Sequence, residues 1–239
     1  MAGALDGRVA VITGSAKGIG RMVARSFAGQ GAKVVLADVD EARLKDTAGE
    51  IGAAALAVPT DVRSEDQVRA LVARAAQHFG GIDVLVNDAG IVPHFQWGVP
   101  KWPRIRDMEQ AFWERVQDVN LGGTFLCTKH ALPHIERRGG HIVNLHGGGG
   151  QFAVAYVTTK EAIRVFSRYV ADEEREAGVC VICVSPSGAI ATEDAPEEAR
   201  QRLPGPESLE QLFLQAAQAP MDLSGKTVRL VDGKLEVVP

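Results

Sequence analysis

The chain has 239 residues, 46% of them hydrophobic and 23% charged, which is unlike a disordered or fibrous chain and predicts one folded domain over residues 1–239. The formal net charge is −4 and no run of Lys and Arg is interleaved with aromatic residues, so we expect a small-molecule partner and no nucleic acid. No apolar run reaches 18 residues, so we expect no membrane partner.

The N-terminus and the cysteines indicate the compartment. Met1–Gly7 contains no basic segment followed by an apolar stretch and a cleavage site, so we expect a cytoplasmic protein. Cys127, Cys180 and Cys183 are an odd number, and the last two lie three apart in one apolar run, where strand geometry points them to opposite faces. We predict buried thiols. The alternative, a C-x-x-C metal or redox site, needs convergent sulfurs and further ligands, so no metal site is predicted.

Short apolar runs alternate with stretches of helical spacing along the chain. The predicted strands, several of them continuously apolar, are Val9–Thr13, Lys33–Ala37, Ala54–Val58, Ile82–Asn87, His141–Leu145, Val179–Val184 and Thr227–Val231. The predicted helices are Gly18–Gly29, Glu41–Ile51, Ser64–Phe79, a long one around Asp107–Arg137, and Ala153–Ala177. This order predicts an α/β fold, a doubly wound parallel sheet of about seven strands with helices on both faces. Ligands of such sheets bind at the carboxyl ends of the strands.

The alternation is interrupted before the last strand. Residues 193–223 are rich in Pro, Glu, Gln and Ala. We predict a partly helical substrate lid there, with an irregular connector as the open alternative.

A glycine-rich turn stands between the first predicted strand and the first helix. It reads Thr13-Gly14-Ser15-Ala16-Lys17-Gly18-Ile19-Gly20. Glycines let a backbone approach a pyrophosphate, and a helix N-terminus offers free N–H groups to an anion. A glycine turn is a weak signal by itself, but this placement strengthens it.

Asp38 bears on the choice of dinucleotide. It follows the second predicted strand, eighteen positions after Gly20, near the spacing of an acid that accepts hydrogen bonds from the adenosine ribose. Its carboxylate would repel a 2′-phosphate, whereas Lys17 could attract one, so NAD is favoured and NADP is less favoured. The alternative role for Asp38 is the N-cap of the helix that begins near Glu41.

Further motifs follow in chain order. They are Asp61 after the third strand, Asn87-Asp88-Ala89-Gly90 after the fourth, Asn120 in a predicted helix, and Tyr156-Val157-Thr158-Thr159-Lys160. With the spacing Gly14-x-x-x-Gly18-x-Gly20, this set resembles the classical short-chain dehydrogenase/reductase (SDR) family over Leu5 to Thr192. Asp88 stands where that family has a second Asn.

The resemblance implies a Rossmann fold, a nicotinamide dinucleotide and a homotetramer or homodimer formed through the long helices. It also implies that Asn120 holds a proton-relay water. Pro186-Ser187-Gly188 stands in place of the family's Pro-Gly, one residue longer, before Ile190 and Thr192. The cofactor contacts so implied are Gly14, Ser15, Lys17, Gly18, Ile19, Gly20, Asp38, Asp61, Val62, Asn87, Ala89, Gly90, Tyr156, Lys160, Pro186, Ile190 and Thr192.

Tyr156 and Lys160 can be interpreted from their chemistry. Four residues apart on a helix, they project from one face, so the ammonium lies near the phenol. A free tyrosine has a pKa near 10, and a neighbouring cation together with an oxidised nicotinamide lowers it. Tyr156 can then exchange a proton with a substrate oxygen while hydride moves to or from the cofactor.

The sequence also departs from the family pattern. The expected serine, thirteen residues before Tyr156, is Val143, and no Ser or Thr lies between them. We hypothesise that His146 replaces it as a hydrogen-bond donor; the alternative is that His146 only caps the strand before a mobile Gly147–Gly150 loop.

A second departure is the extra length of Ile91–Asp107. This segment carries Phe95, Trp97 and Trp102, which could line a pocket for a bulky substrate, or form an interface or a packed loop.

The leading function is therefore an NAD(P)-dependent oxidoreductase that interconverts a secondary alcohol and a ketone, with Tyr156, Lys160, Asn120 and His146 as the catalytic set. The principal rival is a catalytically weak dinucleotide-binding sensor or structural protein, because the usual serine is missing. An epimerase or dehydratase ranks lower, since only 79 residues follow Lys160.

Overall fold

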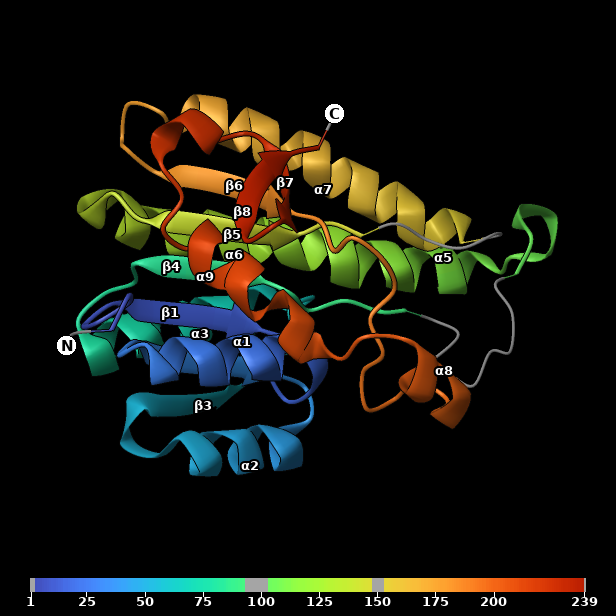
Figure 1. Cartoon of the computed structure of the whole chain (residues 1–239), viewed down its shortest axis with the longest axis horizontal. Coiled ribbons are helices and arrows are strands. Elements are labelled where there is room, and N and C mark those ends of the chain that lie inside the picture. The colour runs from blue at the N-terminus through green and yellow to red at the C-terminus, as the bar shows by residue number, and fades with distance from the viewer. Residues whose placement is uncertain (1–2, 93–102, 148–152, 239) are drawn as a thin grey trace.

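The structure is a computed structural model, which describes residues 3–92, 103–147 and 153–238. The described strands form one eight-stranded sheet in the order β3-β2-β1-β4-β5-β6-β7-β8, parallel except for the β7–β8 pair (Figure 1). The strands are β1 (Val9–Thr13), β2 (Lys33–Asp38), β3 (Ala55–Pro59), β4 (Val84–Asn87), β5 (His141–Leu145), β6 (Cys180–Val184), β7 (Thr227–Val231) and β8 (Lys234–Val237). The predicted doubly wound α/β fold is confirmed.

Helices cover both faces of the sheet. They are α1 (Gly18–Gly29), α2 (Glu41–Ile51), α3 (Glu65–Phe79), α5 (Gln110–Gln117), α6 (Gly123–Ile135), α7 (Val154–Glu173), α8 (Glu197–Arg202) and α9 (Glu210–Ala216). One apolar core lies between the sheet and α1, α2 and α9, and a second lies between the sheet and α3, α6 and α7. Because successive strand residues point to opposite faces, Ala10 and Ile12 enter the first core while Val11 enters the second.

The eighth strand is a finding that the sequence prediction missed. It pairs antiparallel with β7 through Asp232 and Gly233, both with positive φ, at 47° and 76°. An Asp-Gly pair is the usual hairpin signal, because such turns need left-handed backbone at both central residues. The sequence therefore contained the hairpin signal. The strand was missed because β8 is short and mostly exposed, so it lacks an apolar pattern.

The long helix predicted around Asp107–Arg137 is divided into α5 and α6. A π-helical turn, Asp118–Gly122, separates them, so the helical spacing continues although the hydrogen-bond pattern changes. Turns of this kind are often found at functional sites, and this one contains Asn120. The helix predicted to end at Ala177 ends at Glu173.

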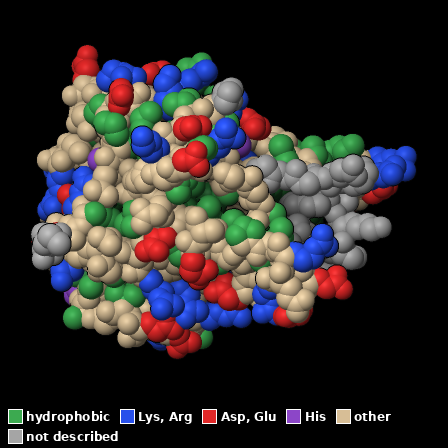
Figure 2. Space-filling model, viewed as in Figure 1, with side chains coloured by type: hydrophobic (Ala, Val, Ile, Leu, Met, Phe, Trp, Pro, Cys, Tyr) green, Lys and Arg blue, Asp and Glu red, His purple; other side chains and the backbone are tan. Residues whose placement is uncertain are grey.

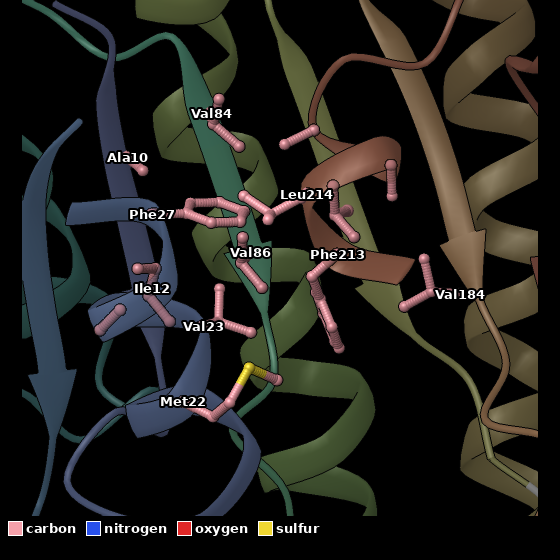
Figure 3. Close-up of a cluster of buried hydrophobic side chains, with 14 of the residues drawn as sticks. Ala10, Ile12, Met22, Val23, Phe27, Val84, Val86, Val184, Phe213 and Leu214 are labelled. Carbon is pink, nitrogen blue, oxygen red and sulfur yellow. The ribbon is translucent and has the colours of Figure 1, made fainter. Parts of the chain in front are cut away.

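Two halves of the segment 193–223 differ in burial. Helix α8 has no buried residue, whereas Leu212, Phe213 and Leu214 of α9 enter the first core. Figure 3 shows Leu214 beside Phe27 of α1, with Phe213 of the same helix further towards Val184 of β6. The lid function stays a prediction. Leu209, just before α9, also lies in the first core, whereas residues 193–208 contribute no side chain to either core.

The cysteine prediction is confirmed for all three residues. Cys127, Cys180 and Cys183 are free and buried, and burial raises the pKa of the thiols to about 12, 11 and 11. Among the described residues, no group of three or more His, Cys, Asp and Glu is arranged to hold a metal ion. None of the described helices combines the length and apolarity needed to cross a bilayer.

Candidate active site

The glycine-rich turn is built on close backbone contacts that exclude side chains. Gly14 has φ 71°, and a Cβ there would lie 2.9 Å from the backbone of Ala89. A Cβ on Gly20 would lie 2.3 Å from the Gly14 carbonyl oxygen. Helix α1 can therefore begin directly against the end of β1 only because both positions are glycine.

Two hydroxyl groups fix this turn to its neighbours. Thr13 Oγ1 accepts hydrogen bonds from the amides of Asp88 (3.2 Å) and Ala89 (3.1 Å) after β4. Ser15 Oγ accepts from the Ala37 amide of β2 (3.0 Å). The Ser15 side chain thus holds the turn in place, so any contact of Ser15 with a cofactor would come from its backbone.

Acidic residues from the segment after β6 lie on the same turn. Gly18 N donates to Glu193 Oε2 (2.9 Å), and Lys17 Nζ forms an ion pair with Asp194. A Cβ on Gly18 would lie 3.1 Å from Thr192 Cγ2. The structure therefore brings the predicted residues Gly18, Lys17 and Thr192 together, with two carboxylates beside them.

Asp38 lies at the end of β2, as predicted. Its carboxylate accepts from the amides of Ala16 (3.1 Å) and Asp40 (3.0 Å). The N-cap of α2 is Asp40, whose side chain accepts from the Arg43 amide (3.1 Å), so the helix-cap alternative for Asp38 is wrong. The Asp38 carboxylate remains beside the glycine-rich turn, where an adenosine ribose would lie.

Asp61 and Val62 follow β3 at the same edge of the sheet. Hydrogen bonds from Arg63 to the Asp61 carboxylate hold the pKa of that carboxyl below its ordinary value. Val62 packs on α6, where a Cβ on Gly123 would lie 2.5 Å from Val62 Cγ2. The adenine contact predicted for Asp61 stays a prediction.

A chain of buried polar side chains runs across the centre of the sheet. Asn87 Nδ2 donates to Asn144 Oδ1 (2.8 Å) and to Thr128 Oγ1 (3.2 Å). Asn144 Nδ2 donates to Ser167 Oγ (2.8 Å), so β4, β5, α6 and α7 are tied together. Asn87 Oδ1 is buried and finds no hydrogen-bond partner among the described residues. The observed role of Asn87 is to fix the strand ends that carry the site.

Asn120 is completely buried in the π-helical turn. Its Oδ1 accepts from the Ile91 amide (2.7 Å), and its Nδ2 donates to Thr159 Oγ1 (3.2 Å). It therefore connects the segment after β4 with α7, one residue before Lys160. The relay water implied by the family resemblance stays a prediction.

Tyr156 and Lys160 lie on one face of α7 at the carboxyl end of β5. Lys160 Nζ lies 5.4 Å from the centroid of the Tyr156 ring and donates to the Leu145 carbonyl (2.9 Å). A Cβ on Gly147 would lie 2.8 Å from the Tyr156 hydroxyl. Burial raises the pKa of Tyr156 and lowers that of Lys160. Without another positive charge, the tyrosine is therefore held protonated.

Comparison with known proteins agrees with this geometry. The short chain dehydrogenase family model matches residues 8–202. Cis-4-hydroxycyclohexanecarboxylate dehydrogenase of Sinomonas cyclohexanicum is 41% identical over 189 residues, 76% of this chain and 73% of that protein. Bovine (Bos taurus) L-fucose dehydrogenase is 38% identical over 184 residues, 75% of this chain and 65% of that protein. The matched region thus spans just under two thirds of the bovine relative.

A solved structure is also similar over nearly its whole length. The 3-ketoacyl-(acyl-carrier-protein) reductase of Brucella melitensis, complexed with NADH, has a TM-score of 0.84 at 32% identity and covers 95% of this chain and 97% of its own. The chain belongs to the short-chain dehydrogenase family.

Within this short-chain dehydrogenase, Asp88 is a site residue to which the sequence analysis assigned no role. Its Oδ1 is buried and has no hydrogen-bond partner in the part of the chain that the structure describes, and its Oδ2 would lie 2.9 Å from a Cβ on Gly20. Burial raises the pKa of the carboxyl to about 7, opposed by the charge of Lys160 and a Gly20 backbone hydrogen bond, while Asp38 raises it further. In turn, the Asp88 anion raises the pKa of Tyr156 and of Lys160. The sequence held one indication that this residue is special, because Asp88 stands where the family has Asn.

His146 follows β5 but has two partners away from Tyr156. Its Nδ1 lies 3.3 Å from Ser185 Oγ and its Nε2 lies 3.2 Å from Glu161 Oε1. If Nε2 donates to the carboxylate, Nδ1 accepts from the Ser185 hydroxyl, and no N–H remains for a substrate. Ser185, after β6, was not singled out in the sequence, since a serine after a strand has many roles. Donation from His146 to a substrate stays a prediction, and it needs one of these contacts to break.

Two predicted features lie outside the described residues. They are the aromatic residues Phe95, Trp97 and Trp102, and the glycine loop over Gly148–Gly150. Of the remaining predicted cofactor contacts, Pro186 and Ile190 are partly buried after β6, in the same segment as Thr192.

The position of Asp88 generates a testable prediction for the pH dependence of activity. Asp88→Asn removes an anion near Tyr156 and Lys160, so the pKa of both groups should fall. If catalysis uses a deprotonated Tyr156 and a protonated Lys160, as the sequence predicts, both limbs of the pH profile for alcohol oxidation should move to lower pH. Asp172→Asn, at an exposed position of α7, is the control. An unchanged profile in Asp88→Asn, or a shift to higher pH, would contradict this electrostatic account.

Proposed function

We propose that this short-chain dehydrogenase transfers hydride between a nicotinamide dinucleotide and a secondary alcohol or ketone, with Tyr156 as general acid and base. The observation that carries the proposal is the position of the Tyr156–Lys160 pair. It lies at the carboxyl edge of the same sheet as the glycine-rich turn, with the Tyr156 hydroxyl against Gly147. A dinucleotide on that turn and a substrate at the tyrosine would meet at this edge.

The glycine-rich turn fits a dinucleotide diphosphate. The turn already binds anionic oxygen atoms, since Gly18 N and Lys17 Nζ hold the carboxylates of Glu193 and Asp194. Gly14 and Gly20 keep side chains away from the phosphate path. Gly18 and Ile19 would supply amides and Lys17 a charge, while the Gly20 amide is held by Asp88. Asp38, Asp61 and Val62 would form the surroundings of the adenosine. Thr192 lies against Gly18 of the turn, and Gly90, Pro186 and Ile190 would stand towards the other end of the crevice.

The chemistry of the residues then follows. The bound cofactor would accept or donate the hydride at the substrate carbon. During alcohol oxidation, ionised Tyr156 takes the proton from the substrate hydroxyl at its Oη, and during ketone reduction it returns that proton. The Lys160 ammonium, 5.4 Å from the centroid of the Tyr156 ring, would stabilise the tyrosinate by its charge, whereas burial raises the pKa of Tyr156. Asn120 connects Thr159 to the segment after β4 and so holds the helix in register.

The substrate class is supported by the named relatives. L-fucose dehydrogenase and cis-4-hydroxycyclohexanecarboxylate dehydrogenase are both named for compounds that carry hydroxyl groups. We propose a secondary alcohol of this kind, and a panel that begins with these two compounds tests it. The rival proposal, a catalytically weak binding protein, is not favoured by these relatives.

We further propose a homotetramer or homodimer in the cytoplasm. Large apolar side chains are exposed on α6 and α7: Phe125, Val154, Val165 and Tyr169. Their position supports assembly through the long helices, and sedimentation of the full chain tests it. On the face shown in Figure 2, basic and acidic side chains are interspersed.

The central test of the proposed function is Tyr156→Phe. This change keeps the ring but removes the transferable proton, so turnover should fall by at least roughly a hundredfold with NADH affinity retained. Tyr169→Phe is a matched control, because Tyr169 is the only other tyrosine and is exposed on the same helix. Near-normal turnover in Tyr156→Phe on an identified substrate would contradict the mechanism, and no turnover in the parent chain despite tight NADH binding would favour the binding-protein alternative.

The cofactor preference generates a separate prediction. We propose NAD rather than NADP, because the Asp38 carboxylate beside Ala16 would repel a 2′-phosphate. NADH should therefore bind more tightly than NADPH in a calorimetric titration. Asp38→Asn should lower the ratio of the NADH affinity to the NADPH affinity by roughly tenfold. Asp46→Asn, at an exposed position of α2, should leave the ratio unchanged. Tighter binding of NADPH to the parent chain would reverse the assignment and favour Lys17 as a phosphate contact.

A further inference from the structure

Two acidic residues lie across the glycine-rich turn, and we call Glu193 and Asp194 the acidic strap. Glu193 Oε2 accepts from the Gly18 amide (2.9 Å), and Asp194 forms an ion pair with Lys17. Gly18 is the first residue of α1, so this amide belongs to the free N–H groups at the positive end of the helix. A carboxylate therefore occupies an amide that a phosphate group would otherwise use.

Two arginines add to the charge around the acidic strap. Arg21 of α1 lies 3.9 Å from Glu193 Oε1, and Arg43 of α2 lies 3.8 Å from Asp194 Oδ1. With Lys17 of the glycine-rich turn, three cations thus face two carboxylates. Each ion pair is partly exposed, so each adds only modestly to the stability of the contact. Together the ion pairs hold the acidic strap at one place.

The segment that carries the acidic strap forms a loop outside both apolar cores. The Ala191 amide donates to the Pro204 carbonyl (2.9 Å), which closes residues 191–204 into a loop. Helix α8, within this loop, has no buried residue, and α9 beyond it is fixed in the first core. In Figure 1 the loop and α8 project beyond the carboxyl edge of the sheet.

We propose that the acidic strap is an internal competitor of the dinucleotide, and that Glu193 and Asp194 lower cofactor affinity by occupying the seat of its diphosphate. This inference rests on the proposed function, because it needs a dinucleotide at the glycine-rich turn. A diphosphate and two carboxylates cannot share one amide and one lysine, so the strap leaves when the cofactor binds. Thr192, which packs on Gly18, moves with it.

The same displacement gives the strap a place in the catalytic cycle. When the cofactor leaves, Lys17 and Gly18 regain anionic partners from within the chain, so the strap favours release of the dinucleotide. Because bound cofactor frees the loop over residues 191–204, the two events, cofactor binding and loop movement, are coupled in both directions.

The test compares Glu193→Gln/Asp194→Asn with the parent chain in calorimetric titrations of NADH and of ADP. Removing the two charges while keeping the side-chain shapes should tighten both ligands by roughly tenfold, given the modest strength of exposed ion pairs and helix-terminus contacts. The affinity for ADP should rise as much as the affinity for NADH, because the acidic strap competes with the diphosphate that both ligands carry. Glu197→Gln/Glu198→Gln is the control, with the same charge change in the same loop but no contact with the glycine-rich turn.

The outcomes separate this inference from the proposed function. Equal NADH affinity in the strap variant and the parent, or weaker binding in the variant, would overturn the inference and leave the proposed function standing. An equal gain in NADH affinity in the control variant would also overturn the inference, because the loss of two negative charges anywhere in the loop would then explain the effect. Failure of every variant to bind NADH or NADPH would overturn the proposed function and this inference together.

Discussion

The close approach of backbone at Gly14 and Gly20 is the constraint on which the rest of the site depends. A single Cβ on Gly20 would lie 2.3 Å from the Gly14 carbonyl oxygen, and one on Gly14 would lie 2.9 Å from Ala89. Without these contacts α1 could not begin directly after β1, and its free amides would not face the crevice. The acidic strap, the position of Asp38 and the contact with the segment after β4 all require this geometry.

The second constraint is electrostatic. Tyr156, Lys160 and Asp88 are three titratable groups in one buried region, and burial disfavours the charged form of each. The Asp88 anion supports the charge on Lys160 but opposes ionisation of Tyr156. Tyr156 is thus held protonated until further positive charge arrives. In the proposed function, an oxidised nicotinamide ring would bring such a charge, so proton transfer would depend on the bound cofactor.

The sequence predicted the fold well because hydrophobic periodicity and turn chemistry agree with the topology. Seven of the eight strands were predicted within two residues, and the missed strand, β8, is mostly exposed. The glycine-rich turn and the Tyr156–Lys160 pair could be placed because local spacing fixes them: a glycine pattern between strand and helix, and one helical turn.

Features that depend on contacts between distant segments could not be predicted in this way. The contact of Glu193 with Gly18 joins residues 175 positions apart, and that of His146 with Ser185 spans 39 positions. No local pattern contains either contact. Asp88 was visible as a departure from the family motif, but its effect on Lys160 and Tyr156 depends on burial, which only the folded chain defines.

The most direct test of the account is the NADH affinity of Gly20→Ala, measured by calorimetry beside Gly49→Ala. Both changes add one methyl group to a helix, but a Cβ on Gly20 meets backbone at 2.3 Å, whereas none lies within 4 Å at Gly49. The account predicts that Gly20→Ala, with its far-ultraviolet circular dichroism spectrum retained, weakens NADH binding by more than roughly tenfold, because the turn can no longer close around the diphosphate. Gly49→Ala should bind NADH like the parent chain. Equal affinity in the two variants would contradict the claim that this turn is the dinucleotide seat.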